Sequence, residues 1–320
     1  MKSQEKVTAF RNGEIKRNRG KGNMGMDACT LCPRMCGVNR AAGEKGYCGM
    51  DATIRAARAA LHMWEEPCIS GTQGSGAVFF SGCSLRCIFC QNFEIAEGNC
   101  AKEISGERLS EIFLELQEQG AANINLVTAA HYVPAVIESL KKAKAQGMDL
   151  PVIYNSSGYE RVETVQMLEA VVDVWLPDFK YMDSKLAFAY SRAKDYPEVA
   201  RAAIREMMKA AGTCAYDEDG YIQKGVIVRH LILPGHTKNS IAVLDELYGT
   251  YGDDLTISLM NQYTPLPQVR NIPDLNRRVT KREYEKVLDH ALDLGITQGF
   301  FQEGGTAKES FIPLFDYEGL

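Results

Sequence analysis

The chain has 320 residues, of which 45% are hydrophobic and 24% are charged, a balance typical of a globular protein with a large core. Its 36 Lys and Arg against 41 Asp and Glu give a net charge of −5, and this composition excludes a disordered chain, a fibre and a small disulfide scaffold. The ten cysteines are unevenly placed, because eight of them precede residue 91.

The first 22 residues form a basic segment. They carry seven Lys and Arg against two Asp and Glu, so the rest of the chain has a net charge of −10. A basic tail can bind nucleic acid, but an acidic body would repel the phosphate backbone. We therefore expect residues 1–22 to be a flexible, solvated tail, and we expect no nucleic-acid partner.

The cysteines are predicted to stay reduced or metal-bound rather than to form disulfides. The N-terminus shows no apolar stretch of secretory-signal length. No later stretch approaches the roughly 18 consecutive apolar residues of a membrane span. We therefore expect a cytoplasmic protein without a membrane partner, in a compartment that keeps thiols reduced.

Residues 23–75 are rich in Gly and Cys and are predicted to form a small metal-binding N-terminal unit. Four of its cysteines are separated by two, three and eleven residues: Cys29, Cys32, Cys36 and Cys48. Four thiolates at this spacing fit a structural zinc ion or an auxiliary 4Fe-4S cluster, and unmetallated redox thiols are a third interpretation. Cys68 lies too far from them to join the set, and we expect it to be a buried thiol.

From residue 76 onward, short apolar runs alternate with amphipathic segments, as in repeated strand-helix units. The runs predicted to be strands are 77–80, 124–128, 152–154, 174–180, 226–233, 255–260 and 299–302. Helical spacing of apolar residues predicts helices around 109–116 and 133–140, and Thr280 with Glu283 forms a capping box that opens another. Residues 76–320 are thus predicted to form an α/β domain, a partial or full (β/α) barrel with its chemistry at the C-terminal strand ends.

Two segments interrupt this alternation. Residues 183–212 are long enough for two helices, and the second is predicted to start at Pro197. Residues 217–220 read as a turn that leads into the strand at residue 226.

The strongest motif follows the first of these strands directly. Cys83, Cys87 and Cys90 are separated by three and two residues, so three thiolates lie on one short loop. Thiolates are the preferred ligands of iron-sulfur clusters, and three of them leave one iron of a four-iron cubane open. A structural zinc ion requires four closed ligands. The loop is therefore predicted to hold a catalytic 4Fe-4S cluster.

This loop, with Phe89 directly before its last cysteine, resembles the radical S-adenosylmethionine (SAM) superfamily. The resemblance implies that the open iron binds the amino and carboxylate groups of SAM. It also implies that the reduced cluster cleaves SAM to a 5′-deoxyadenosyl radical, which abstracts hydrogen from a substrate. Phe89 would then contact the adenine side of SAM, although it could also be an ordinary core aromatic.

Three further elements narrow the resemblance to the activating enzymes of glycyl-radical enzymes, the pyruvate formate-lyase activase group, and there to homologues with an N-terminal four-cysteine unit. They are Cys90-Gln91-Asn92, Asp178-Phe179-Lys180 and the run from Arg229 to Gly235. The resemblance implies an oxidoreductase with flavodoxin or ferredoxin as reductant and a glycyl-radical enzyme as protein substrate. Asp178 and Lys180 would contact SAM, the Asp also binding a monovalent cation, and Arg229 is a further candidate.

Two departures from the group's pattern affect the SAM and cation sites. Where the group has a Gly-Gly-Glu element after the second strand, this chain has Thr128-Ala-Ala-His131, so the SAM amine would bind Thr128, a backbone carbonyl or His131. Where the group has an acidic residue after the third strand, this chain has Asn155 and Ser156. The sequence therefore leaves undecided whether a monovalent cation binds here.

The residues outside the cysteine loop could also have a purely structural role instead of binding SAM. Asp178 and Lys180 are two residues apart on a strand, so they would point the same way and could form an ion pair. Arg229 and His230 would face opposite sides of a regular strand, so at most one of them points into the barrel. A buried, hydrogen-bonded histidine is an equal alternative for His131.

Two other functions remain as alternatives. One is an iron-sulfur electron-transfer or redox-sensing protein without SAM turnover, and the other is a radical SAM enzyme that modifies RNA. The sequence leaves open whether the substrate is a protein glycine or a small molecule. It also leaves open the N-terminal metal, the reductant and the oligomeric state.

Overall fold

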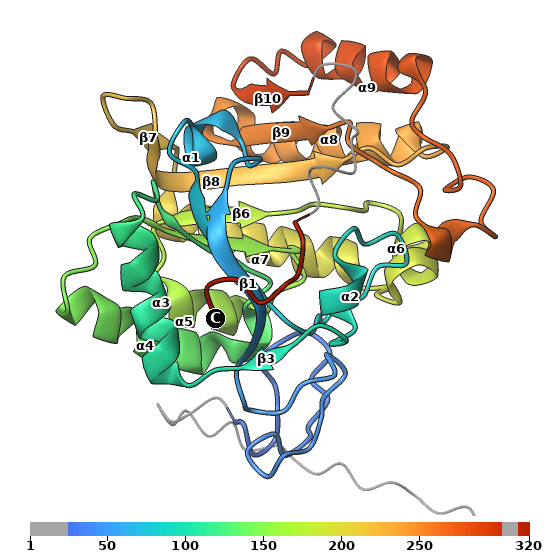
Figure 1. Cartoon of the computed structure of the whole chain (residues 1–320). Coiled ribbons are helices and arrows are strands. Elements are labelled where there is room, and N and C mark those ends of the chain that lie inside the picture. Colours follow the sequence, from blue (N-terminus) through green and yellow to red (C-terminus); the bar gives the residue numbers. More distant parts are fainter. Residues whose placement is uncertain (1–24, 303–312) are drawn as a thin grey trace, which may run out of the picture.

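A ten-stranded mixed sheet forms the centre of the computed structural model, which describes residues 25–302 and 313–320 (Figure 1). The predicted basic tail, residues 1–22, lies outside the described residues. The strands joined in parallel are β2 (Ser75–Phe80), β4 (Ile124–Val127), β5 (Val152–Ser156), β6 (Val174–Pro177), β8 (Ile222–Leu231), β9 (Thr256–Met260) and β10 (Gly299–Phe301). They coincide with the predicted apolar runs, so the α/β fold class is confirmed.

The sheet is open in the described part of the chain, which makes the fold a partial barrel. The strand order is β10-β9-β8-β6-β5-β4-β2-β1-β3. Antiparallel pairing joins β1 (Arg55–His62) to β2 and to the short β3 (Lys102–Glu103), and β7 (Ala215–Tyr216) to β8. Strand β1 was not predicted, because its Ala-rich sequence lacks the β-branched and aromatic residues that are typical of strands. It extends the main sheet from within the predicted N-terminal unit.

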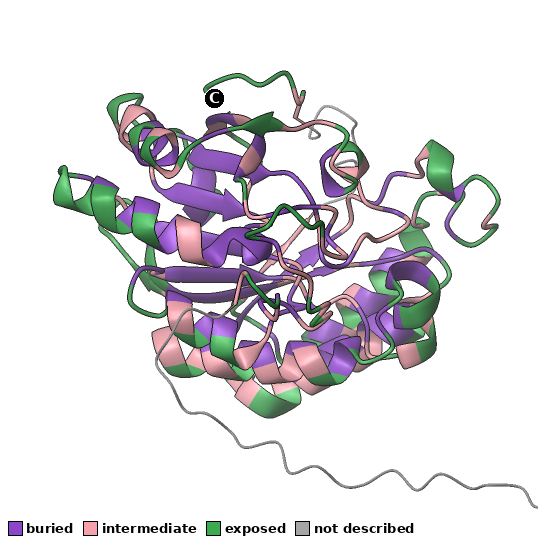
Figure 2. Cartoon of the chain, turned by 90° about the horizontal axis from the view of Figure 1, so that it is seen from below, coloured by how far each residue is buried: buried purple, intermediate pink, exposed green. Residues whose placement is uncertain are grey.

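Helices cover the outer face of the parallel strands, and Figure 2 shows buried strands beside helices that are buried on one side and exposed on the other. The α-helices are α1 (Pro67–Ser70), α2 (Phe93–Ala96), α3 (Gly106–Glu118), α4 (Val133–Ala145), α5 (Val162–Leu168), α6 (Ser184–Ser191), α7 (Tyr196–Ala211), α8 (Thr237–Tyr251) and α9 (Lys281–Asp293). Short 3₁₀ turns are η1 (Ala130–Tyr132), η2 (Gly252–Asp254) and η3 (Pro267–Val269). None of the helices in the described ranges is long and apolar enough to cross a membrane.

The predicted helix signals are borne out in detail. Thr280 and Glu283 form the reciprocal capping box of α9. The segment at 183–212 contains α6 and α7, with Pro197 in the first turn of α7. The Asp183 side chain caps α6 by accepting hydrogen bonds from two backbone amides, which satisfies donors that a helix N-terminus leaves unpaired.

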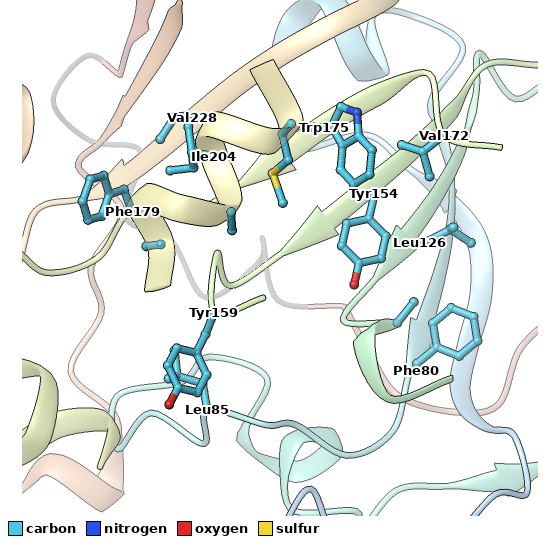
Figure 3. Packing of buried hydrophobic residues seen from close by; sticks show 14 of the residues in the cluster. Phe80, Leu85, Leu126, Tyr154, Tyr159, Val172, Trp175, Phe179, Ile204 and Val228 are labelled. Atoms are coloured by element: carbon cyan, nitrogen blue, oxygen red, sulfur yellow. The ribbon is translucent and has the colours of Figure 1, made fainter. Parts of the chain in front are cut away.

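Alternate strand residues divide the core between the two faces of the sheet. On the outer face, Tyr154 and Trp175 pack edge to face with ring centroids 5.7 Å apart, within one large cluster that includes the helices (Figure 3). On the inner face, Ile153 and Leu176 pack against Cys68 at the start of α1. The segment around α1 therefore covers part of the barrel interior, and Cys68 is a buried thiol as predicted.

The last described residues run along β1. The Tyr317 amide donates to Ala57 O at 3.0 Å, and the Ala59 amide donates to Glu318 O at 2.8 Å. Arg58 forms ion pairs with Asp316 and Glu318. Residues 313–320 thus form a strap that lies against the edge of the sheet.

The two tryptophans provide a test of this core. Trp175 is fully buried, whereas Trp64 is 58% exposed. We expect Trp175→Ala to lower the free energy of unfolding by about 3–5 kcal/mol, because the cavity left in the core cannot fill. Trp64→Ala is the matched control and should change it by about 0.5 kcal/mol or less. Urea unfolding followed by circular dichroism measures both, and equal losses would contradict the assignment of the core.

Candidate active site

Predicted site residues from separate segments line one cavity at the C-terminal edge of the parallel strands. The cavity has a volume of about 220 Å³. Apart from His131, its lining includes every residue predicted to hold the catalytic cluster or SAM: Cys83, Cys87, Phe89, Cys90, Thr128, Asn155, Ser156, Asp178, Lys180 and Arg229. They meet because the carboxyl ends of neighbouring parallel strands lie at the same edge of the sheet.

The three cysteines after β2 lie close to one another and receive hydrogen bonds. The Leu85 amide donates to Cys83 Sγ at 3.4 Å, and the Ser191 hydroxyl donates to Cys87 Sγ at 3.0 Å. Burial raises the pKa of the Cys87 and Cys90 thiols, and the nearby charge of Lys180 opposes this rise at both. Holding Cys87 and Cys90 as thiolates therefore requires positive charge close to them.

No set of three His, Cys, Asp or Glu side chains in the described ranges is arranged around a single ion, and this holds for the catalytic loop and for the four N-terminal cysteines alike. A cubane cluster binds each thiolate through a different iron, so its ligand sulfurs need not converge on one point.

Buried charges form a network across the cavity. The Arg229 guanidinium donates to Asp178 Oδ1 at 3.0 Å and to Asn155 Oδ1 at 2.5 Å. Lys180 forms an ion pair with Asp178, as the structural interpretation of these two residues predicted. Burial alone would raise the pKa of Asp178, but the charges of Lys180 and Arg229 outweigh it and lower that pKa. Asp178 is therefore ionised at neutral pH.

Glu65 completes the network and was not predicted. Its Oε2 accepts from Arg229 at 3.0 Å, and its Oε1 accepts from the side-chain amides of Asn125 and Asn155, both at 3.1 Å. It comes from the loop between β1 and α1 and lines the cavity. A buried Asn in the apolar run of β4 was the one sequence signal for a polar partner inside the barrel, but it did not point to Glu65.

Of the residues that replace the Gly-Gly-Glu element, Thr128 lines the cavity and His131 does not. Thr128 lines the cavity with a φ of 62°, a left-handed conformation that strains a β-branched residue. His131 is buried, with Nε2 2.7 Å from Ser81 O. Burial lowers the pKa of His131 to about 3, so it is a neutral, hydrogen-bonded histidine and does not line the cavity.

The packing of Phe89 and His230 can be compared with the predictions made for them. Phe89 is buried, with its ring centroid 6.4 Å from that of Tyr190, and it also lines the cavity, so both interpretations of this residue remain. His230 points away from Arg229, as predicted, because its ring nitrogens lie 2.7 Å from Phe179 O and 2.9 Å from Ser240 Oγ on α8.

The four N-terminal cysteines also lie near one another. A Cβ atom added at Gly46 would lie 3.1 Å from Cys36 Sγ and 3.7 Å from Cys48 Sγ. Burial raises the pKa of Cys32 to about 12, and the charges of Cys48 and Cys29 add to the shift. The fold therefore brings together the four thiols that the spacing grouped, and glycine at position 46 leaves room beside them.

Comparison with known proteins gives relatives of low identity. No family model matches the chain. The uncharacterised protein MJ0674 of Methanocaldococcus jannaschii is 29% identical over 270 residues, which cover 82% of this chain and 74% of that protein.

Solved structures are similar in fold. HydG, a maturase of the [FeFe]-hydrogenase, has a TM-score of 0.50 at 14% identity, over 74% of this chain and 54% of HydG. Streptococcus suis SuiB bound to S-adenosylmethionine has a TM-score of 0.46 at 13% identity, over 69% of this chain and 48% of SuiB. The chain thus spans about half the length of these two proteins, and the likeness to HydG supports the α/β fold.

Proposed function

We propose that the chain is a radical SAM enzyme, an oxidoreductase in which Cys83, Cys87 and Cys90 hold a 4Fe-4S cluster. The observation that supports this most directly is the shared cavity: the three thiols open onto the same space as Asp178, Lys180 and Arg229. When bound, the cluster supplies one electron for reductive cleavage of SAM, and SAM supplies the radical that removes hydrogen from the substrate.

The charges in the cavity match the charges of SAM. SAM carries a carboxylate, an amine and a sulfonium, so it needs both cationic and anionic partners. Lys180 has three donors, and its ion pair with Asp178 uses only part of them, which makes it a partner for the carboxylate. Glu65 and Asp178 supply carboxylates for the amine and the sulfonium. Glu65 thus takes over the role for which the Gly-Gly-Glu carboxylate is missing.

We further propose that the substrate is a glycine of a partner glycyl-radical enzyme and that flavodoxin or ferredoxin is the reductant. Support comes from the Cys90-Gln91-Asn92 and Asp178-Phe179-Lys180 elements, both at the cavity. The four N-terminal thiols are proposed to hold a second metal, an auxiliary 4Fe-4S cluster or zinc.

Anaerobic reconstitution with iron and sulfide, followed by reduction with SAM present, tests the chemistry. We expect 5′-deoxyadenosine from the wild-type chain and none above background from Cys87→Ala. Cys214→Ala is the matched control, because Cys214 lies outside the cavity lining, and it should keep the activity. A reconstituted, reduced wild-type protein that yields no 5′-deoxyadenosine would show that the proposal is wrong.

The role of Lys180 in SAM binding is tested separately. We expect Lys180→Gln to weaken SAM binding about tenfold or more, because a hydrogen bond to a charged group contributes about 1.5–3 kcal/mol. Lys185→Gln, at an exposed lysine of α6, is the control. Equilibrium dialysis with labelled SAM measures the dissociation constant, and equal values for both variants would remove Lys180 from the site.

The identity of the substrate is tested with a candidate glycyl-radical enzyme. We expect a glycyl-radical EPR doublet on the partner after incubation with reduced enzyme and SAM. Deuterium from a glycine-labelled partner should also appear in 5′-deoxyadenosine. Deuterium transfer from a small molecule instead would replace the activase role while leaving the radical chemistry in place.

A further inference from the structure

An arginine of the N-terminal cysteine unit forms hydrogen bonds with the catalytic cysteine loop. Arg34 lies between Cys32 and Cys36, yet its guanidinium leaves the unit. Nε donates to Ser84 O at 2.9 Å, and Nη2 donates to Ser191 O at 2.9 Å. Nη1 donates to Arg192 O at 2.6 Å. Since Ser84 lies between Cys83 and Cys87, one side chain of the unit holds the backbone of the catalytic loop.

Aromatic rings fix the direction of this arginine. The Arg34 guanidinium carbon lies 4.2 Å from the ring centroid of Tyr47 and 5.1 Å from that of Tyr159. Tyr47 directly precedes Cys48, and Tyr159 follows β5. A cation held by two rings and three carbonyls has few other orientations available. Its position therefore depends on how the unit around Cys48 is folded.

Residues of the catalytic loop also contact the N-terminal unit. Arg86 of the catalytic loop approaches Gly49 so closely that a Cβ atom there would lie 2.6 Å from Arg86 Nη2. The backbone of the unit touches Gly82, where a Cβ atom would lie 2.9 Å from Cys48 O. The backbone of Cys48 therefore lies directly against Gly82, next to Cys83, and the Arg86 side chain lies against Gly49.

Helix α6 connects Arg34 to the predicted cluster ligand Cys87. Ser191, whose carbonyl accepts from Arg34, donates its hydroxyl to Cys87 Sγ at 3.0 Å. The next loop residue, Ile88, donates its amide to Tyr190 O at 2.9 Å. A displacement of Arg34 would therefore shift both the carbonyl of Ser84 and the hydroxyl that supports Cys87.

We propose that the four-cysteine unit acts as a clamp: when it is metal-bound, it fixes the conformation of the catalytic loop. Arg34 is the positioning residue through which the unit holds the cluster ligands in place. This rests on the proposed function for the loop. Metal binding at Cys29, Cys32, Cys36 and Cys48 orders the unit, fixes Arg34 and holds the loop in the conformation that retains iron. Because such coupling is reciprocal, a filled loop also stabilises the metal of the unit.

Full-length Arg34→Lys tests the clamp, because lysine keeps the charge but cannot bond three carbonyls in one plane. Arg161→Lys is the matched control: Arg161 donates to Thr30 O in the unit at 2.6 Å but not to the loop. We expect Arg34→Lys to release iron to a chelator about tenfold faster from the SAM-responsive cluster. The control should match wild type.

Hydrogen exchange in the metal-loaded full-length chain gives an independent readout, because it does not depend on SAM turnover. We expect the amides of residues 83–90 to exchange faster in Arg34→Lys than in Arg161→Lys or wild type. Tyr47→Leu, which removes one ring from the arginine, should have the same effect at smaller size and covers the case in which Arg34→Lys does not fold. Unchanged loop exchange in both Arg34→Lys and Tyr47→Leu would overturn the clamp.

The two proposals fail in different ways. A wild-type protein without a SAM-responsive EPR signal would remove the radical SAM function, while the hydrogen-exchange comparison would still test the clamp. A wild-type protein with a normal signal, and an Arg34→Lys variant with the same rate of iron release, would remove the clamp alone.

Discussion

The burial of Arg229 is the constraint on which the cavity depends. A guanidinium withdrawn from water is destabilising unless its donors are all satisfied. Here the partners come from three elements: Asp178 after β6, Asn155 on β5 and Glu65 from the loop after β1. That requirement holds the α1 segment inside the barrel, and it places carboxylates and cations at the strand ends where the cysteine loop also lies.

Buried arginine side chains also anchor the N-terminal unit. A short, Gly-rich segment cannot bury a core of its own. Arg40 is 1% exposed and donates to Asp51 O and to His131 O, each at 2.5 Å, so it joins the unit to the barrel. Together with Arg34, it gives the unit a fixed orientation through backbone carbonyls. Both cysteine groups are thereby joined by hydrogen bonds of buried and partly buried arginines.

Local patterns in the sequence were enough for the parallel strands, the capping box of α9 and the convergence of Asp178, Lys180 and Arg229. Each depends on side-chain periodicity or on the position of a residue at the end of a strand. Glu65 and β1 were missed for a different reason. The Ala-rich β1 is a strand only because β2 pairs with it, and Glu65 enters the cavity only because β1 delivers it there. Both are consequences of tertiary pairing, which no local pattern records.

The strap at residues 313–320 has a consequence for colloidal behaviour. Beyond its short pairing with β3, the outer edge of β1 would present unpaired amides and carbonyls, a template for pairing with another chain. Tyr317 and Glu318 occupy that edge, and Asp316 and Glu318 add negative charge beside Arg58. Loss of the strap would therefore promote edge-to-edge aggregation, although the strap contributes only Pro313 to the lining of the cavity.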